Sequence, residues 1–278
     1  MILPIVLAIT LKVLVTPASD GIQISGALIY FTIKMPIQDF PITESQINSW
    51  AVMLTILFLC LFLTRHLDTK NPTARQHAAE WIVEKCEGLV HTNMDAEFNA
   101  YGPFIAAIMA LSAFSSLLSL FGMYAPTSDI NVVSGWAILV FFLITHYKLK
   151  CGVGHYLKSF ASPALLTPLN VISEIATPIS MAFRHYGNVL SGSVISVLIG
   201  YALTVVSNKI LGFLPGFLSE IPIFRVGLPA VLSLYFDIFS GLLQAYIFAM
   251  LTMLYVNGAF PAEDYAKKRR KKQQAGKI

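Results

Sequence analysis

The sequence predicts an all-α integral membrane protein with about five spanning helices, the last two long and steeply tilted as a hairpin. Hydrophobic residues make up 56% of the 278 residues and charged residues only 12%. This leaves too little charge for the surface of a water-soluble protein of this size. We expect three parts: an amino-terminal leader and extracytoplasmic cap at 1–46, a membrane domain at 47–257 and a basic cytoplasmic tail at 258–278.

The amino-terminal part is expected to lie outside the membrane domain. Residues 1–15 form an apolar run with one basic residue, Lys12, shorter than the roughly 20 residues of a spanning helix. This run fits either a cleaved signal peptide or an uncleaved leader or short interfacial helix. Between residues 21 and 50, the alternation in IQISGALIYFTIKMPI predicts a strand or short hairpin broken by Pro36 and Pro41.

Three spanning helices are expected next, at residues 47–64, 101–124 and 132–147. Between the first two, residues 71–99 are amphipathic and predict an interfacial helix packed on the bundle, with contact to a peripheral stalk as the alternative. The second span carries serines at helical spacing, which either permit close helix packing or line a water path. These serines are Ser112, Ser115, Ser116 and Ser119.

Two longer apolar segments follow, at residues 165–205 and 225–256. At 1.5 Å per residue, one continuous helix over the first segment would be about 60 Å long, roughly twice the hydrocarbon thickness of a bilayer. It must therefore be steeply tilted or broken, and Pro178 and Gly187 are candidate kink positions. Two overlong segments in succession favour a tilted hairpin.

Loop charge predicts the orientation of the chain. With the amino terminus outside and the carboxyl terminus in the cytoplasm, most basic loop residues lie inside, including the tail KKRRKK at 267–272. That tail produces the formal net charge of +4, and it is interpreted as a solvated segment or an anchor to lipid headgroups. We expect contact with the lipid bilayer and no nucleic-acid partner.

Three cysteines show neither metal-ligand spacing nor a disulfide framework. They are Cys60, Cys86 and Cys151. We interpret them as free thiols, and we expect no metal and no other cofactor.

The first of the two long segments gathers its polar residues on one helical face. At about 100° per residue they form a stripe about 100° wide. Its members are Asn170, Glu174, Thr177, Arg184, Asn188 and Ser191, with Met181 as the apolar member. An arginine at membrane depth costs on the order of 3 kcal/mol on insertion scales, and its guanidinium stays protonated at physiological pH. Such a permanent positive charge suits an ion pathway.

The last segment has a polar face of its own, so two polar faces could delimit aqueous paths. Its members are Ser233, Asp237, Ser240, Gly241 and Gln244. The structural alternative is that Arg184 forms a buried ion pair with Glu174 or Asp237 and only fixes helix packing. Desolvation offsets much of the attraction in such a pair.

The motifs around Arg184 resemble those of a known family. PLNVIS at 168–173, PIS at 178–180, Arg184 and the pair Gly187 and Asn188 are similar to the signature of subunit a of F-type ATP synthases. The resemblance extends over roughly residues 45–257, in the family's order.

Three further stretches carry the same resemblance. GLLQAYIFAMLTMLYV at 241–256 is similar to the family's last helix, with Gln244 at the family's glutamine. PTSDIN at 126–131 resembles the loop before the family's third membrane segment. The spacing of Pro72, Gln76 and Glu80 resembles the segment after its first.

The resemblance implies a non-catalytic stator subunit that translocates ions through two half-channels formed with a rotating c-ring. Arg184 would force each ring carboxyl to release its ion and would block leakage. Peripheral-stalk subunit b would be a further partner, and a bacterial inner membrane the location. ATP chemistry would belong to other subunits, and the sequence contains no G-x4-G-K-[ST] phosphate loop.

We hypothesise the residues of the two paths from their position relative to Arg184, on a helix that enters the membrane from the cytoplasm. The cytoplasmic path would contain Asn170, Ser173, Glu174 and Thr177. The external path would contain Asn188, Ser193, Asp237 and Gln244. Asp129 is a further candidate, and His185 is interpreted as a packing or hydrogen-bonding residue.

Some path residues depart from the family pattern. Asn170 stands where many relatives carry a glutamate, which Glu174 could replace from one helical turn later. Thr177 replaces a common basic residue. Ser193 stands where some relatives have an acid or a histidine, so Asp237 could serve the external path alone.

Two other functions stay open at this point. A self-contained ion or solute transporter would be expected to show repeated, interrupted helices in both halves, and only one polar-striped hairpin is found. A structural membrane scaffold would leave the cost of Arg184 unexplained. The sequence leaves open whether protons or sodium ions are carried.

Overall fold

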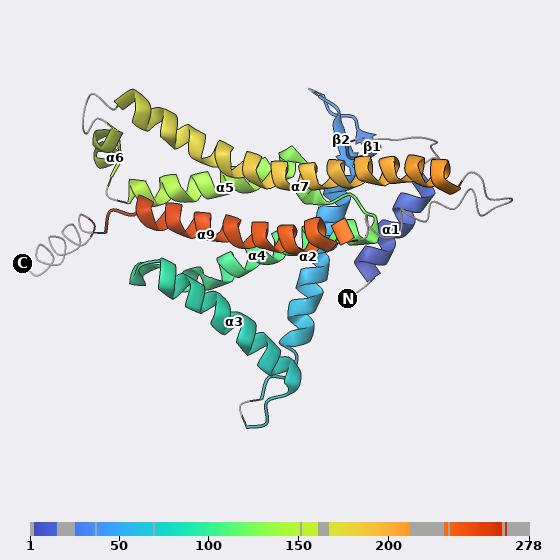
Figure 1. The fold of residues 1–278 in the computed structure, drawn as a ribbon. Coiled ribbons are helices and arrows are strands. Elements are labelled where there is room, and N and C mark those ends of the chain that lie inside the picture. The colour runs from blue at the N-terminus through green and yellow to red at the C-terminus, as the bar shows by residue number, and fades with distance from the viewer. Residues whose placement is uncertain are drawn as a thin grey trace, which may run out of the picture.

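The structure, a computed structural model, is an elongated bundle of helices with one small hairpin of strands (Figure 1). It describes residues 3–15, 26–36, 38–68, 70–150, 152–160, 167–211, 231–232, 234–262 and 265. Its first elements are α1 (Leu3–Val15), β1 (Ile29–Ile33), β2 (Phe40–Thr43), α2 (Glu44–Leu63), α3 (Ala74–Asn93), η1 (Ala96–Tyr101) and α4 (Gly102–Leu117). The remaining elements are η2 (Leu118–Phe121), η3 (Pro126–Ser128), α5 (Ile130–Leu149), α6 (Val153–Phe160), α7 (Thr167–Leu211), η6 (Leu234–Ser240) and α9 (Gly241–Ala259).

Five helical segments of the described chain are long and apolar enough to cross a membrane. They are Glu44–Leu63, Ala96–Phe121, Ile130–Leu149, Thr167–Ser207 and Leu234–Ala259. The predicted all-α membrane fold with about five spans is therefore confirmed. Each predicted span overlaps one of these segments, and the ends differ by a few residues where both are described.

A kink or break was expected in the fourth span, at Pro178 or Gly187, but the departure from α-helical geometry occurs in the last span. α7 runs as one helix of 45 residues through both Pro178 and Gly187, so a broken fourth span is the wrong alternative. At 1.5 Å per residue α7 is about 67 Å long. The last span instead begins with η6, a seven-residue π-helical turn that contains Asp237. Such turns are rare and often occur at functional sites.

The predicted strand hairpin is present, but the prediction that Pro41 breaks it is wrong, because Pro41 lies within β2 opposite Thr32. β1 and β2 pair antiparallel, with Ile29 opposite Thr43 and Ile33 opposite Phe40. The hairpin leads directly into α2, where the Thr43 amide donates to the Gln46 side-chain oxygen at 3.3 Å and satisfies a free amide at the helix start.

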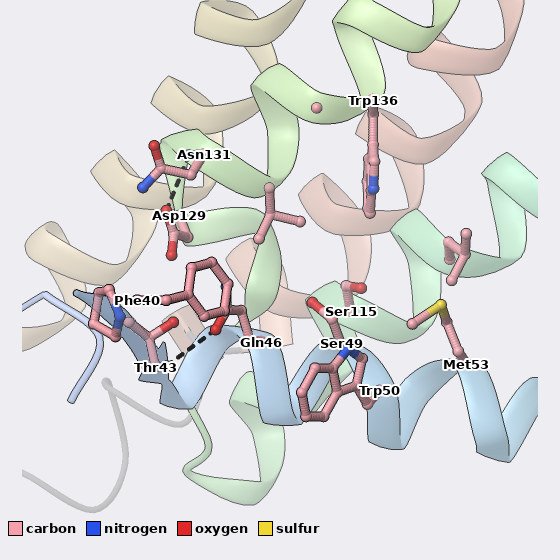
Figure 2. Close-up of a pocket in the computed structure, with 14 residues that line it drawn as sticks. Phe40, Thr43, Gln46, Ser49, Trp50, Met53, Ser115, Asp129, Asn131 and Trp136 are labelled. Carbon is pink, nitrogen blue, oxygen red and sulfur yellow. Dashed lines mark hydrogen bonds between the residues drawn. The ribbon is translucent and has the colours of Figure 1, made fainter. Parts of the chain in front are cut away.

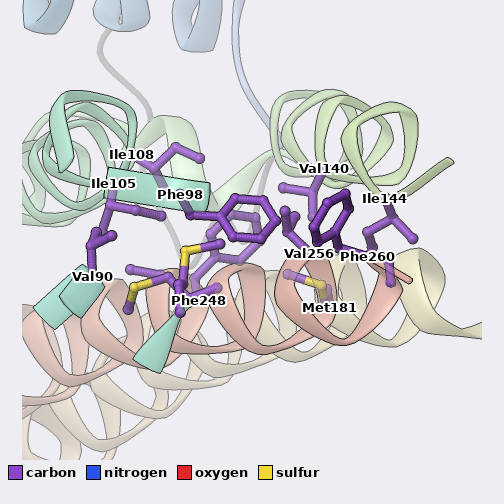
Figure 3. Packing of buried hydrophobic residues seen from close by; sticks show 14 residues of the cluster. Val90, Phe98, Ile105, Ile108, Val140, Ile144, Met181, Phe248, Val256 and Phe260 are labelled. Carbon is purple, nitrogen blue, oxygen red and sulfur yellow. The ribbon is translucent and has the colours of Figure 1, made fainter. Parts of the chain in front are cut away.

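The main core is built around α9. Small and apolar residues of α9, including Phe248, Ala249 and Val256, pack against α4 and α5 and against Phe98 of η1 (Figure 3). A Cβ atom added at Gly241 would lie 2.6 Å from the Ser116 Cβ, so glycine is needed where α9 crosses α4. A Cβ atom at Gly192 of α7 would lie about 3 Å from the Phe236 side chain.

The predicted amphipathic segment forms α3. Only Gln76 and Val90 of this helix are buried, and Figure 1 shows α3 diverging from the long helices of the bundle. Val90 belongs to the main core, whereas Trp81 is 60% exposed. α3 therefore contacts the bundle mainly through its carboxyl-terminal part, and its interfacial role stays a prediction.

Candidate functional site

Arg184 lies near the middle of α7 and points away from the bundle. Arg184 is exposed, whereas Met181, Ala182 and His185 on the neighbouring face of α7 are buried. No ion pair of Arg184 is found within the described part of the chain. The alternative of a buried pair with Glu174 or Asp237 therefore finds no support there, and Met181 packs in the core instead of completing the polar stripe.

His185, the next residue, lies on the side of α7 that packs against the bundle. Its side chain is fully buried, and its Nε2 lies 3.3 Å from the Ser112 hydroxyl. The rings of Trp136 and Phe248 meet the imidazole edge to face, with centroids 5.9 and 5.5 Å away. The interpretation of His185 as a packing and hydrogen-bonding residue agrees with these contacts, which turn the adjacent Arg184 outward.

The first cavity, which we call the Glu174 cavity, has a volume of about 290 Å³. It lies where α5 and α9 end. Its lining residues are Phe141, Ile144, Lys148, Glu174, Thr177, Leu254, Tyr255, Gly258 and Ala259. Two of the four residues expected on the cytoplasmic path therefore share one cavity. Of the other two, Asn170 is half-buried and Ser173 is exposed, both on α7.

Glu174 has partners that sequence reasoning missed. Its carboxylate forms an ion pair with Lys148 of α5 and accepts a hydrogen bond from the Tyr156 hydroxyl of α6 at 3.3 Å. Burial and the charge of Glu174 raise the pKa of Tyr156 above its ordinary value, so Tyr156 stays a protonated donor. A basic residue is thus present beside Glu174, but it comes from α5 and not from position 177.

The second cavity, the Asp237 cavity, has a volume of about 380 Å³. It lies at the other end of the bundle, beside the segment that precedes α5 and the turn that precedes α9. Its lining residues are Gly26, Ser119, Met123, Tyr124, Ala125, Ser128, Tyr186, Val189, Leu190, Ser193, Val194, Val197 and Asp237. Ser119 lines the same cavity as Asp237, and its hydroxyl donates to the Ser116 carbonyl oxygen at 2.6 Å. Ser193 and Asp237, two residues expected on the external path, are therefore brought together.

The other two residues expected on that path bind each other. The Asn188 amide donates to the Gln244 side-chain oxygen at 2.8 Å and so ties α7 to α9 one helical turn beyond Arg184. Gln244 is buried, and neither residue lines the Asp237 cavity. Along α7, Asn188 lies between Arg184 and Ser193 of the Asp237 cavity, and Gln244 binds it from α9.

A third cavity of about 540 Å³ lies between β2, α2, α4 and α5 (Figure 2). Asp129 is one of its lining residues, but both of its carboxylate oxygens have structural partners. One accepts from the Asn131 amide at 3.0 Å and caps α5, and the other accepts from the Ser45 hydroxyl of α2. The candidate Asp129 thus joins α2 to the start of α5, away from Arg184.

The arrangement places Arg184, which has no ion pair among the described residues, between the Glu174 cavity and the Asp237 cavity along α7. Thr177 precedes Arg184 by seven residues and Ser193 follows it by nine, or about 11 and 14 Å along the helix. Lipid does not stabilise an exposed arginine at this depth, so the polar face of α7 requires water or a protein partner. The fold and site define a multi-span helical membrane protein with an exposed arginine on the outer face of its longest helix, α7.

Comparison with known proteins gives the family. Residues 46–257 match the family described as ATP synthase A chain. The ATP synthase subunit a of Desulforamulus reducens is 32% identical over 222 residues, which cover 77% of this chain and 78% of that protein. The corresponding subunit of Priestia megaterium is 31% identical over 235 residues, covering 78% and 92%, and that of Alkalihalophilus pseudofirmus is 29% identical over 243 residues, covering 80% and 95%.

This chain belongs to the ATP synthase A chain family. The match covers the region over which the motifs resemble subunit a, so the predicted family is confirmed. The chain is accordingly a multi-pass membrane subunit of a bacterial type of ATP synthase, and the chemistry on ATP takes place in other subunits.

Proposed function

We propose that this chain is the ion-translocating stator subunit of its ATP synthase, with two half-channels that meet a rotating c-ring at Arg184. The observation that supports this most directly is the separation of the two polar cavities. The Glu174 cavity and the Asp237 cavity lie at opposite ends of the bundle, and the exposed Arg184 lies between them on α7.

The chemistry follows from a fixed charge beside a moving carboxyl. A ring carboxyl must be neutral, by protonation or ion binding, while it faces lipid. An opposite charge within about 4 to 6 Å lowers the pKa of such a carboxyl by roughly 1 to 3 units, so the ring site releases its ion when it reaches Arg184. The guanidinium stays charged throughout and blocks a direct leak between the half-channels.

The exposed face of α7 supports a protein partner at this position. Phe183, adjacent to Arg184, is exposed, and so are Ile195 and Leu198, which lie on the same side of α7 at 100° per residue. A ring of helices would cover these residues and supply the acid that opposes the arginine. Each ion that then crosses down a membrane potential supplies about 2.3 kcal/mol per 100 mV, which rotation of the ring would convert into work.

The two paths are assigned from the cavities. Glu174 and Thr177, with Asn170 and Ser173 nearby on α7, would form the cytoplasmic path. Ser193 and Asp237 would form the external path. The pair of Asn188 and Gln244 would connect that path to the neighbourhood of Arg184.

The orientation and the remaining partners belong to the same proposal. Loop charge favours an external amino terminus and a cytoplasmic carboxyl terminus in a bacterial inner membrane. Because α7 is about 67 Å long and the hydrocarbon core is about 30 Å thick, α7 and the span that contains α9 would lie steeply tilted. The exposed face of α3 would be available to peripheral-stalk subunit b. Residues 1–46, 47–257 and 258–278 would form the cap, the membrane domain and the cytoplasmic tail.

Replacement of the fixed charge tests the proposal. We expect Arg184→Ala to abolish ATP synthesis driven by an ion gradient while the complex still assembles, because the exposed side chain makes no ion pair in the described structure. Lys209→Ala is the matched control, since Lys209 is an exposed basic residue near the carboxyl-terminal end of α7. Sustained synthesis by the Arg184→Ala complex would refute the proposal.

Reconstitution separates this function from that of a self-contained transporter. Purified chain in vesicles should conduct neither protons nor sodium ions by itself, whereas vesicles that also contain the c-ring should do so. Ion flux through the isolated chain at the rate of the complete membrane sector would favour the transporter.

A further inference from the structure

The Glu174 carboxylate of α7 is held by two donors that come from different helices. Its Oε2 forms the ion pair with Lys148 near the end of α5, and its Oε1 accepts the hydrogen bond of the Tyr156 hydroxyl of α6 at 3.3 Å. The Glu174 side chain is 14% exposed and the Lys148 side chain 28% exposed. Both oxygens of a largely buried carboxylate are therefore occupied, one of them by a tethered cation.

Lys148 also neutralises the cavity that Glu174 lines. Among the described lining residues of the Glu174 cavity, Lys148 and Glu174 are the ones that carry a charge at neutral pH. The other polar side chains of this lining are the hydroxyls of Thr177 and Tyr255. The charges of the cavity therefore cancel, although it contains a carboxylate.

Without Lys148 the same cavity would suit a metal cation. Hard cations take carboxylate and water oxygens as ligands, and acidic side chains attract cations in membrane pores. Glu174 would supply the carboxylate, and a cavity of about 290 Å³ has room for several water molecules. The ammonium of Lys148 occupies the place on Glu174 that such a cation would take, and it offers three donors and no acceptor.

The ion pair affects sodium ions and protons differently. A metal cation needs several oxygen ligands at once, so a sodium ion could bind Glu174 only if Lys148 left it. A water molecule both donates and accepts hydrogen bonds, so water in the cavity can pass protons while the ion pair stays intact. Lys148 thus acts by occupying the carboxylate and not by adding net charge to the cavity.

We propose that Lys148 is a specificity-determining residue of the cytoplasmic path, because its ammonium keeps sodium ions off Glu174 so that the path carries protons. The inference rests on the proposed function, which assigns the Glu174 cavity to this path. Lys150, two residues further along, has different partners. Its Nζ lies over the rings of Tyr147 and Phe260, 4.3 and 5.4 Å from their centroids.

Sodium sensitivity of the complete ATP synthase tests the role of Lys148. In inverted membrane vesicles, whose cytoplasmic face is outside, ATP-driven proton uptake is measured while sodium chloride replaces choline chloride in the outer medium at constant ionic strength. The unmodified complex should pump at one rate throughout. For Lys148→Met we expect a several-fold fall below its own rate in choline, because a sodium ion can then bind Glu174 and obstruct the path. Lys148→Arg, which keeps the charge, should stay insensitive to sodium.

Lys150→Met is the matched control, because it removes a neighbouring ammonium that contacts aromatic rings instead of Glu174. Its rate should not depend on sodium. In the double variant Lys148→Met/Glu174→Gln, the rate that remains should also be independent of sodium, because the carboxylate is gone. If Lys148→Met does not assemble, Lys148→Gln, which keeps a hydrogen-bond donor beside Glu174, is measured in the same way.

Two results would overturn the role of Lys148. One is pumping by the assembled variant that is as insensitive to sodium as that of the unmodified complex, which is what an ion pair that only joins α5 to α7 would give. The other is transport of sodium ions by the unmodified complex. If Arg184→Ala still abolished ATP synthesis in either case, only the role of Lys148 would fail and the proposed function would stand.

Discussion

The two long helices of the carboxyl-terminal half have similar apolar composition and opposite surroundings. In the most apolar window of the span that contains α9, 39% of residues are buried inside the chain, compared with 11% for α7. α9 supplies the centre of the core, whereas α7 lies along the outside of the bundle with Arg184 exposed. The comparison shows that one helix holds the fold together and the other presents a surface that needs a partner.

The largest expected difference in stability comes from replacing one phenylalanine on each helix with alanine. Phe248→Ala should destabilise the chain by about 3 kcal/mol or more, because it leaves a cavity in the core. Phe183→Ala should leave stability within about 0.5 kcal/mol, because Phe183 is 60% exposed. Unfolding of the purified chain in detergent measures both. Equal losses of stability would show that α7 is as deeply packed as α9.

A smaller effect is expected where α9 crosses α4. Gly241→Ala places a methyl group against Ser116 and should destabilise by about 1 to 3 kcal/mol through overpacking. Gly135→Ala on α5 has no neighbouring atom within 4 Å of the added Cβ and should be neutral or stabilising. Thermal unfolding of the two variants compares them directly. A neutral Gly241→Ala would contradict the close approach of the helices.

The smallest expected effect concerns the ion pair between Lys148 and Glu174, which joins α5 to α7. Lys148→Met and Glu174→Gln each break the ion pair between α5 and α7. Because the two side chains form one unit, the double variant should be less affected than the sum of the single variants, by about 1 kcal/mol. Double-mutant analysis of stability, with ion flux measured in parallel, tests this. Strict additivity would mean that the pair contributes nothing.

The sequence predicted the five spans well, because they depend on local periodicity and composition. The positions of Arg184, Glu174 and Thr177 on one surface of a helix follow from 100° per residue. The partners of these residues depend on contacts between distant segments. No local pattern of the sequence indicates that Lys148 of α5 pairs with Glu174 of α7. The pairing of Asn188 with Gln244 also requires the packing of α7 on α9.

The last span shows where extrapolation by a constant period fails. Asp237 and Gln244 were placed on one α-helical face, but the π-helical turn Leu234–Ser240 changes the rotation per residue between them. As a result Asp237 faces the cavity that Ser119 also lines, while Gln244 faces Asn188. Ser233, the remaining residue of that predicted face, lies outside the described residues, as do Cys151 and residues 212–230. A unique turn of this kind leaves no periodic signal in the sequence.

The contact between Gly192 and Phe236 has a mechanical consequence. Because a Cβ atom on Gly192 would lie about 3 Å from the Phe236 side chain, the backbone of α7 packs directly against this ring of the turn before α9. A lateral displacement of α7 is therefore transmitted to α9 and its core with little deformation at this contact. A component that must hold still while its neighbour turns is well served by such a stiff joint.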